Sequence, residues 1–223
     1  EFRRVLFRSA AKNVTRDVSL VFDFIERPYS PVRFKELLVS PNEMKQKFSR
    51  LINEEIKNKQ AGKPAYILIK INHITDPVMV KKLYEASSHG VRIDLLVRGN
   101  CSLITGVPGV SDTIRINGII DRYLEHSRIF IFANGGDEKM FIGSADWMPR
   151  NLDNRVEVIA PVYDPEIKAD LKRVVEYGLK DTLQGRVVDG TGENRPWISE
   201  DKTAFRSQEE LYKYYLNENR IKD

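Results

Sequence analysis

The sequence is poor in cysteine: Cys101 is the single one in 223 residues, so an internal disulfide is excluded. No cluster of cysteine and histidine has the spacing of a zinc site. A reducing cytoplasm is the location expected from this composition. No apolar run approaches the roughly 18 residues that a membrane-spanning helix requires, so no such helix is predicted.

The sequence also lacks a large excess of either charge: it has 36 basic and 32 acidic residues, and its formal charge is +4. This mild excess favours an anionic ligand in one basic site and predicts no nucleic-acid partner. The Walker sequence, the dinucleotide glycine fingerprint and the Gly-x-Ser-x-Gly elbow are absent. Any phosphate chemistry must therefore depend on histidine and arginine.

The chain begins with a stretch that does not resemble the remainder. Residues 1–9, EFRRVLFRS, have no cap, turn or clear period, and we interpret them as non-native adapter sequence. A helix is expected directly afterwards, with Val18, Val21, Phe22 and Ile25 at helical spacing. Since this helix starts without a capping signal, we expect the chain to be a truncated piece of a longer protein.

Capping signals predict four further helices. They begin at Ser40-Pro41, Asp76-Pro77, Asp164-Pro165 and Ser207. Glu43 and Glu210 would complete capping boxes with the two serines. Tyr212, Tyr214, Tyr215 and Leu216 of the last helix are expected to pack onto the body of the domain.

Short β-branched runs alternate with these helices. They are FKELLVS, AYILIKI, VRIDLLV, TIRINGII, RIFIF, KMFIGS and RVEVIAPV. The alternation predicts an α/β fold with a mixed β-sheet flanked by helices. Asn134-Gly135-Gly136-Asp137 has turn chemistry and predicts a hairpin between RIFIF and KMFIGS.

Candidate site residues stand where strands begin or end. His126 and Arg128 precede a strand and lie two apart, and therefore on the same face. Arg98 follows a strand, at the end where crevices form in open α/β sheets, and could bind an anion or form a structural bridge with Asp112 or Asp121. A lone histidine such as His126 is, on its own, more often a hydrogen-bonded surface residue.

Further downstream, GSADWMPRNLDNRVEV places Arg155 at the start of a strand beside the same crevice, and Asp146 and Trp147 are expected to turn away from it. Trp147 is favoured as a core residue over a base-stacking platform, because single-strand binders use several aromatic residues. His89 is favoured as structural at a helix end, His73 as a solvent-facing loop residue, and Cys101 as an ordinary loop thiol.

Three stretches carry a family resemblance: FIERPYSPVRFKELLVSP, LLVRGNCSLITGVPGVSD and DRYLEHSRIFIFANGGDEKMFIGSADWMPRNLDNRVEV. From about Lys12 to about Val188 the chain resembles the C-terminal catalytic region of bacterial polyphosphate kinase, which polymerises the terminal phosphate of ATP. That region has two domains similar to phospholipase D. The resemblance implies that residues 10–32 form the last helix of the first domain and residues 33–223 the second domain.

The resemblance also implies roles. His126 matches the second histidine of the family, which assists phosphoryl transfer, while Arg98 and Arg155 match arginines that contact phosphate. The histidine that becomes phosphorylated, most of the Mg²⁺ ligands and the adenine-binding tyrosine would lie in the missing upstream domain, so no metal ligand is expected here and the isolated fragment is expected to be inactive. ATP, ADP and polyphosphate are the expected ligands. An intact homo-oligomer, in the cytoplasm or peripheral at the inner membrane, is also expected.

The phospholipase D signature has histidine-x-lysine followed by an acidic residue and Gly-Ser. This chain has His126-x-Arg128, then Gly143-Ser144, and we expect Arg128 and Ser144 to bind phosphate as well. Arginine keeps the positive charge of lysine but has a planar guanidinium group with several N–H donors, which suits a phosphate chain. Two alternatives stay open: a dimeric phosphodiesterase of the phospholipase D type, disfavoured by the missing lysine, and a fragment that binds polyphosphate without catalysis.

Overall fold

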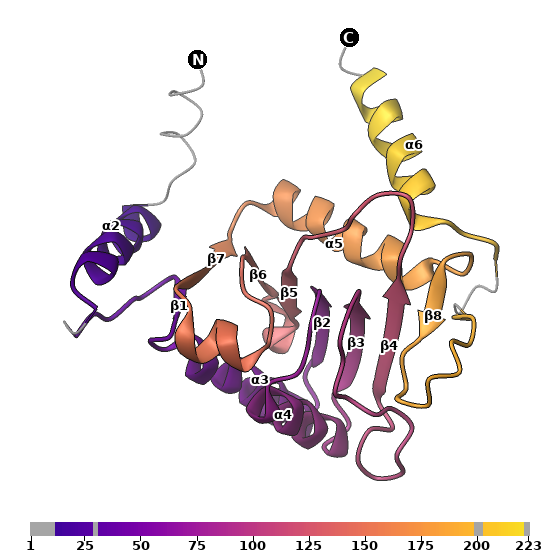
Figure 1. Ribbon diagram of the computed structural model, residues 1–223, viewed down its shortest axis with the longest axis horizontal. Coiled ribbons are helices and arrows are strands. Elements are labelled where there is room, and N and C mark those ends of the chain that lie inside the picture. Colours follow the sequence, from indigo (N-terminus) through magenta and orange to yellow (C-terminus); the bar gives the residue numbers. More distant parts are fainter. Residues whose placement is uncertain (1–11, 29–30, 199–202, 221–223) are drawn as a thin grey trace.

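The computed structural model describes residues 12–28, 31–198 and 203–220, so the expected adapter, residues 1–9, lies outside the described residues. Eight strands form one mixed sheet in the order β1-β7-β6-β5-β2-β3-β4-β8 (Figure 1). This confirms the predicted α/β class. None of the described helices combines the length and the apolar character required to cross a membrane.

All seven predicted strands are present, and β8 is an addition that the sequence did not predict. Their bounds are β1 Leu38–Ser40, β2 Tyr66–Ile71, β3 Arg92–Val97, β4 Ile114–Ile119, β5 Ile129–Phe132, β6 Lys139–Gly143, β7 Glu157–Val162 and β8 Gly185–Val187. The helices are α2 Lys12–Glu26, α3 Met44–Gln60, α4 Pro77–Ser88, α5 Pro165–Lys180 and α6 Ser207–Arg220, with a 3₁₀ turn at Asn134–Gly136 and a π-helical turn at Arg150–Asn154.

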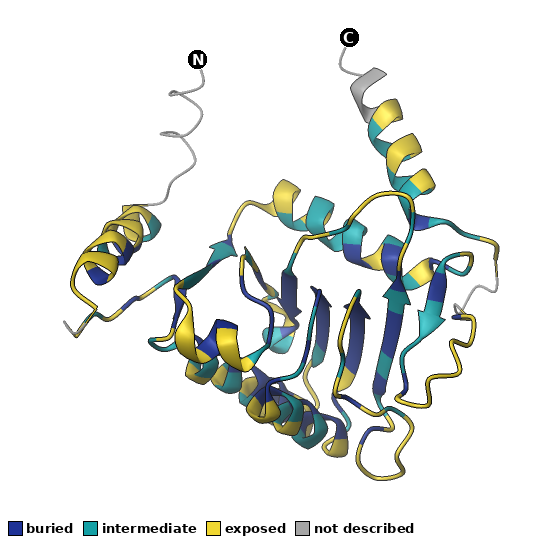
Figure 2. Ribbon diagram, in the orientation of Figure 1, coloured by how far each residue is buried: buried dark blue, intermediate teal, exposed yellow. Residues whose placement is uncertain are grey.

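Helices cover both faces of the sheet (Figures 1 and 2). The alternation of side chains along β2 decides which residue meets which layer. Ile67 and Ile69 belong to the larger apolar cluster with α3 and α4, whereas Leu68 belongs to the cluster that contains Val175 of α5. Because both faces are covered, the central strands are buried almost along their whole length.

One end of the sheet gathers the polar termini of seven strands. β2, β3 and β4 are parallel to one another, and β5, β6, β7 and β1 follow in antiparallel pairs. The carboxyl ends of β1, β2, β3, β4 and β6 therefore lie at the same end as the amino ends of β5 and β7. Residues far apart in the sequence meet there, which makes this end the place for a site.

Two of the proline-linked caps are confirmed. Asp76 accepts hydrogen bonds from the N–H groups of Val78 and Met79 at 3.0 Å each, and opens α4. Asp164 accepts in the same way from the second and third residues of α5. The hairpin is confirmed as well: β5 and β6 pair antiparallel, and Asn134, Gly135 and Gly136 all have positive φ between them.

The prediction that Ser40 caps a helix is wrong. Ser40 is the buried last residue of β1, and α3 begins only at Met44. Its hydroxyl donates to the carbonyl of Arg155 at 2.8 Å and accepts from the N–H of Glu157 at 3.2 Å. Pairing with Glu157 of β7, 117 positions away, thus replaces the local capping pattern.

The last helix is confirmed, but its predicted capping box is wrong. The hydroxyl of Ser207 donates to Asp181 at 2.7 Å, while the N–H of Glu210 donates to the carbonyl of Arg206. Tyr214 and Tyr215 do contact α5, through Arg173 and Asp170 respectively. Tyr212 and Leu216 are instead exposed.

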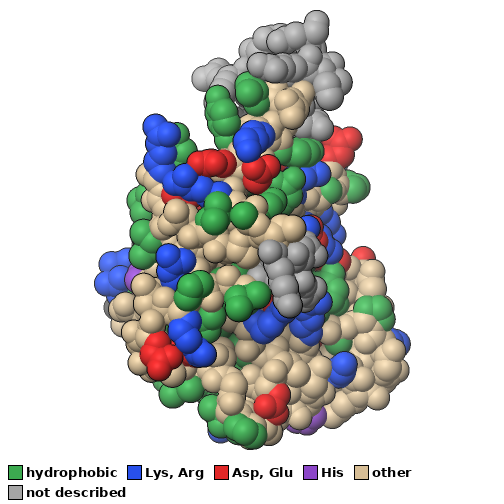
Figure 3. Space-filling model, turned by 90° about the vertical axis from the view of Figure 1, so that its right-hand side faces the viewer, with side chains coloured by type: hydrophobic (Ala, Val, Ile, Leu, Met, Phe, Trp, Pro, Cys, Tyr) green, Lys and Arg blue, Asp and Glu red, His purple; other side chains and the backbone are tan. Residues whose placement is uncertain are grey.

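The first helix is present, with a different buried face from the one predicted. Val21 and Phe24 of α2 pack with Phe34 and Leu37, whereas Val18, Phe22 and Ile25 are exposed. Asp17 is also buried and accepts from the N–H groups that lead into β1. On the face shown in Figure 3, basic side chains lie in several separate groups among acidic and apolar ones.

Candidate functional site

The centre of the candidate site is an ion pair between β5 and β6. Arg128, just before β5, donates through Nε to Oδ1 of Asp146 at 3.2 Å and through Nη2 to Oδ2 at 3.0 Å. Both side chains are largely buried, with 11% and 7% of their surface exposed. Such a two-point pair fixes the plane of the guanidinium group. The expectation that Asp146 turns away from the site is therefore wrong.

His126 lies on the outer side of this ion pair. Nη1 of Arg128 is 3.2 Å from Nδ1 of His126 and donates to the His126 carbonyl at 3.0 Å, and Nη2 is 3.3 Å from Nε2. Guanidinium groups only donate, so a neutral imidazole can accept at just one of its two nitrogens at a time. The histidine itself is exposed, so its ring faces solvent where a ligand can approach.

Asn72 connects this pair to Arg98. Asn72 follows β2, and its N–H and side-chain amide donate to Oδ1 of Asp146 at 2.9 and 3.3 Å. Its side-chain oxygen accepts from Nε of Arg98, directly after β3, at 3.0 Å. Arg98, Asn72, Asp146, Arg128 and His126 thus form one continuous polar network across four strands. Neither Asp112 nor Asp121 pairs with Arg98 in the described chain, so the structural-bridge alternative does not hold.

The carboxyl group of Asp146 is stabilised in its charged form. Burial opposes ionisation, but the hydrogen bonds from Arg128 and from the N–H groups of Asn72 and His73 outweigh it, so the pKa of Asp146 lies below its usual range. The site therefore contains a permanent negative charge beneath Arg128. This charge orients the guanidinium and partly neutralises it.

Ser144 and Arg155 lie at the same end of the sheet, further along it. The hydroxyl of Ser144 donates to the carboxylate of Glu157 and accepts from the N–H of Val158 at 3.2 Å. Arg155 is exposed just before β7, and among the described residues its guanidinium forms no hydrogen bond with the network. The structure thus brings Arg128 and His126 into direct contact, links Arg98 to them through Asn72 and Asp146, and leaves Arg155 outside this network.

The remaining sequence candidates play structural parts. Trp147 is fully buried against Phe48 and Phe130, as predicted. His89 ends α4 and bonds the carbonyl of Glu85, as predicted. His73 accepts from the N–H of Asn100 at 2.9 Å instead of simply facing solvent. Burial raises the pKa of the Cys101 thiol, which fits an ordinary loop thiol.

Sequence reasoning missed three polar residues of this region. Asn72 and Asp146 connect the network, and Lys70 is a buried lysine within β2 whose Nζ is 2.9 Å from Glu125. Lys70 carried a usable signal, because a charged side chain in the apolar run AYILIKI requires a partner when buried. Asn72 gave no such signal, since a polar residue after a strand is common in any loop.

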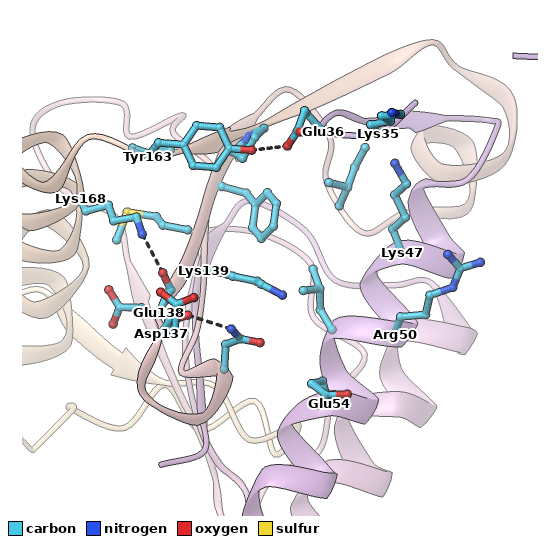
Figure 4. A pocket seen from close by; sticks show the side chains of 17 residues that line it. Lys35, Glu36, Lys47, Arg50, Glu54, Asp137, Glu138, Lys139, Tyr163 and Lys168 are labelled. Carbon is cyan, nitrogen blue, oxygen red and sulfur yellow. Dashed lines mark hydrogen bonds between the residues drawn. The ribbon is translucent and has the colours of Figure 1, made fainter. Parts of the chain in front are cut away.

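A hollow of about 610 Å³ lies at the opposite end of the sheet (Figure 4). It has an apolar floor that includes Leu38, Leu51 and Phe141, and a rim of mixed charge that is labelled in the figure. Several of the rim groups are already paired: Glu36 with Tyr163, Glu138 with Lys172, and Lys168 and Lys47 with backbone carbonyls. We assign the site to the polar network rather than to this hollow, because the charges around the hollow nearly balance.

A divalent cation requires several oxygen or nitrogen ligands together. Within residues 12–28, 31–198 and 203–220, no group of three or more His, Cys, Asp or Glu side chains has the arrangement of a metal site. The carboxylate within the network, Asp146, is bonded to Arg128 and to two backbone N–H groups. These residues do not fit a Mg²⁺ site on their own.

Comparison with known proteins identifies the family. The model of the polyphosphate kinase C-terminal domain 2 matches residues 37–208. The polyphosphate kinase of Escherichia coli K12 is 43% identical over 206 residues, which are 92% of this chain and 30% of that protein. The enzyme of Klebsiella pneumoniae is 44% identical with the same coverage. This chain thus spans less than a third of the length of these relatives.

Solved structures show a likeness to the same family. The crystal structure of polyphosphate kinase from Porphyromonas gingivalis has a TM-score of 0.89 and 38% identity, covering 95% of this chain and 33% of that one. A phospholipase D family member, Nuc from Salmonella typhimurium, reaches a TM-score of 0.49 at 15% identity, which is too weak to bear on function. The residues at the candidate site, Arg98 to Arg155, all lie within the region that the family model matches. The chain belongs to the polyphosphate kinase C-terminal domain 2 family.

Proposed function

We propose that this chain is part of a polyphosphate kinase, which reversibly transfers the terminal phosphoryl group of ATP to inorganic polyphosphate. Its relatives of that name are about three times longer, since the chain covers 30% of them. The histidine that becomes phosphorylated and the Mg²⁺ ligands would lie upstream. The intact protein would be a cytoplasmic homo-oligomer, and the isolated chain would be inactive.

The observation that carries this proposal is the network from Arg98 through Asn72, Asp146 and Arg128 to His126. It joins two arginines to a histidine at one end of the sheet, and the histidine is exposed to solvent. The strand order also sets the arginines apart at regular steps: Arg155 precedes β7, Arg128 precedes β5 and Arg98 follows β3, and these strands lie two places apart in each step. Two strand spacings are roughly 10 Å. An extended polyanion matches such a row better than a compact ligand does.

The chemistry follows from the charge that phosphoryl transfer develops. In-line transfer requires alignment and neutralisation of the phosphate oxygens more than it requires covalent chemistry. Arg98 and Arg155 would neutralise phosphates on either side of His126. His126, on the exposed outer side of Arg128, would donate a hydrogen bond to the leaving phosphate from the ring nitrogen that does not accept from Arg128. Mg²⁺, bound elsewhere in the intact protein, would supply further neutralisation of the phosphates.

Substitution of His126 in the intact enzyme tests the proposal. Removal of one preorganised donor typically lowers a rate about 100- to 1,000-fold, so His126→Ala should lose at least about tenfold in ATP-dependent polymer synthesis while the fold survives. His89→Ala is the matched control, because His89 is exposed at the carboxyl end of α4, away from the network. Unchanged synthesis by His126→Ala would remove the proposed role.

The phosphodiesterase alternative has its own test. The signature lysine is replaced by Arg128, whose side chain is bonded to Asp146 and therefore less free to bind a phosphodiester. We expect no cleavage of a chromogenic phosphodiester by the purified chain. Cleavage that disappears in His126→Ala would favour that alternative over the kinase.

A further inference from the structure

The segment that carries His126 has little apolar support of its own. Residues 120–128 connect β4 to β5 without regular secondary structure, and Ile120, Tyr123 and Leu124 expose 76%, 60% and 75% of their surface. A hollow of about 530 Å³ lies between this segment and α6, which further reduces its packing. Polar contacts must therefore fix its position.

Three of these polar contacts come from the first turn of α6. Gln208 accepts from the N–H of Tyr123 at 2.9 Å and donates to the carbonyl of the same residue at 2.8 Å. Its Nε2 is also 3.0 Å from Oε1 of Glu125, the residue before His126. The other carboxylate oxygen of Glu125 is 2.9 Å from the buried Lys70.

Arg206 binds the beginning of the same segment. Its Nε and Nη2 donate to the two oxygens of Asp121 at 3.0 and 2.7 Å, and this two-point pair lowers the pKa of Asp121. The start of α6 is itself fixed to the end of α5, because the N–H and hydroxyl of Ser207 both donate to the buried Asp181, at 2.8 and 2.7 Å. The segment is thus attached to a rigid support rather than to another loop.

We propose that Gln208 is a positioning residue for His126: it fixes Tyr123 and Glu125, and thereby sets where the imidazole stands relative to Arg128 and the phosphates. This inference depends on the proposed role of His126 in phosphoryl transfer. Gln208 is the last residue that the family model matches, about 80 positions from the histidine it supports.

The experiment uses the intact enzyme with Gln208→Ala. A displacement of about 1 Å at a reacting group can cost up to 100-fold in rate, so we expect kcat for polymer synthesis to fall by about tenfold. The KM for ATP should stay within about twofold, because the arginines keep their contacts. Gln208→Glu retains the acceptor for the N–H of Tyr123 but sets a carboxylate against the Tyr123 carbonyl and Glu125, and should be impaired at least as much as Gln208→Ala. Asn217→Ala, an exposed change on the same helix, is the control.

Two further measurements separate positioning from general structural support. If Gln208 acts only through His126, Gln208→Ala should lower synthesis no further in a His126→Ala background. Amide hydrogen exchange of residues 120–128 should become faster in Gln208→Ala, while exchange in β2 and β3 stays unchanged.

The outcomes are distinct. An impaired His126→Ala with a fully active Gln208→Ala would overturn the positioning role and leave the proposed function intact. Additive losses in the double variant would overturn it as well, because Gln208 would then act independently of the histidine. A fully active His126→Ala would instead overturn the proposed function, and the positioning role with it.

Discussion

Arg128 and Asp146 meet in a two-point ion pair where β5 begins and β6 has just ended, and both Asn72 and His126 are bonded to this pair. The buried Asp146 orients the guanidinium from the protein interior, and the exposed His126 contacts it from the solvent side. The pair contributes to stability and to site geometry at once, so the two contributions require separate experiments.

Removal of Asp146 should be costly for folding. Asp146→Ala leaves the largely buried Arg128 without a carboxylate partner, and breaking a buried ion pair in this way costs about 3–5 kcal/mol of unfolding free energy. Urea denaturation followed by circular dichroism measures the change. Glu54→Ala, which removes an exposed ion pair with Lys57, is the control and should change stability by less than about 0.5 kcal/mol. Equal effects of the two substitutions would contradict the prediction.

The stability that Asp146 contributes should depend on pH. Its pKa in the folded protein is lowered, because burial is outweighed by the hydrogen bonds from Arg128, Asn72 and His73. The unfolded carboxyl titrates near 3.9, so the contribution is fully present above about pH 4 and is lost as the pH falls further through the folded value.

Asp146→Asn provides the reference for this measurement. The difference in unfolding free energy between the two proteins should be constant from pH 7 to pH 5 and should shrink below about pH 4. Other shifted carboxyl groups, such as Asp121, are common to both proteins and cancel in the difference. A difference that grows on acidification would show that the sign is wrong.

Trp147 offers a comparison between packing and hydrogen bonding. It is fully buried, and within the described chain its indole Nε1 has no hydrogen-bond partner. Trp147→Ala should cost about 3–5 kcal/mol through the cavity that it creates. Trp147→Phe should cost less than half of that, because it keeps the aromatic contact with Phe48 and Phe130 and removes an unpaired donor. Similar losses in both variants, measured by urea denaturation, would contradict this.

If Arg98 and Arg155 contact phosphates, polyphosphate binding by the chain should depend on the salt concentration. Arg98→Ala and Arg155→Ala should each weaken polyphosphate binding by the chain and reduce the steepness of its salt dependence, because each removes one phosphate contact. Arg50→Ala removes the same charge at the opposite end of the sheet and is the matched control. Titration of fluorescently labelled polyphosphate at rising NaCl gives both quantities. Equal weakening by all three substitutions would indicate a general charge effect.

Much of the fold could be predicted from the sequence because its signals are local. The caps at Asp76 and Asp164 and the hairpin turn at Asn134 to Asp137 are decided by neighbouring residues, and all are confirmed. Ser40 carries the same local signal as Asp76. It belongs instead to a strand, because its hydroxyl finds partners in β7 that no local pattern reveals.

The candidate site was predictable in its charged residues but not in what connects them. Arg98, His126 and Arg128 stand at strand ends, which strand order brings together. Asn72 joins residues that lie 26 and 74 positions away, so its function depends on register rather than on sequence spacing. The support of Tyr123 by Gln208 spans 85 positions and is equally invisible in the sequence.

The single thiol of the chain lies three residues beyond Arg98, in the loop that pairs with Ile74 at the same end of the sheet. A maleimide dye would therefore label one defined position without any cysteine having to be removed first. Since the thiol is partly buried, its labelling reports on opening of that loop. This chain thus already contains one attachment point for a spectroscopic label beside the proposed phosphate-binding residues.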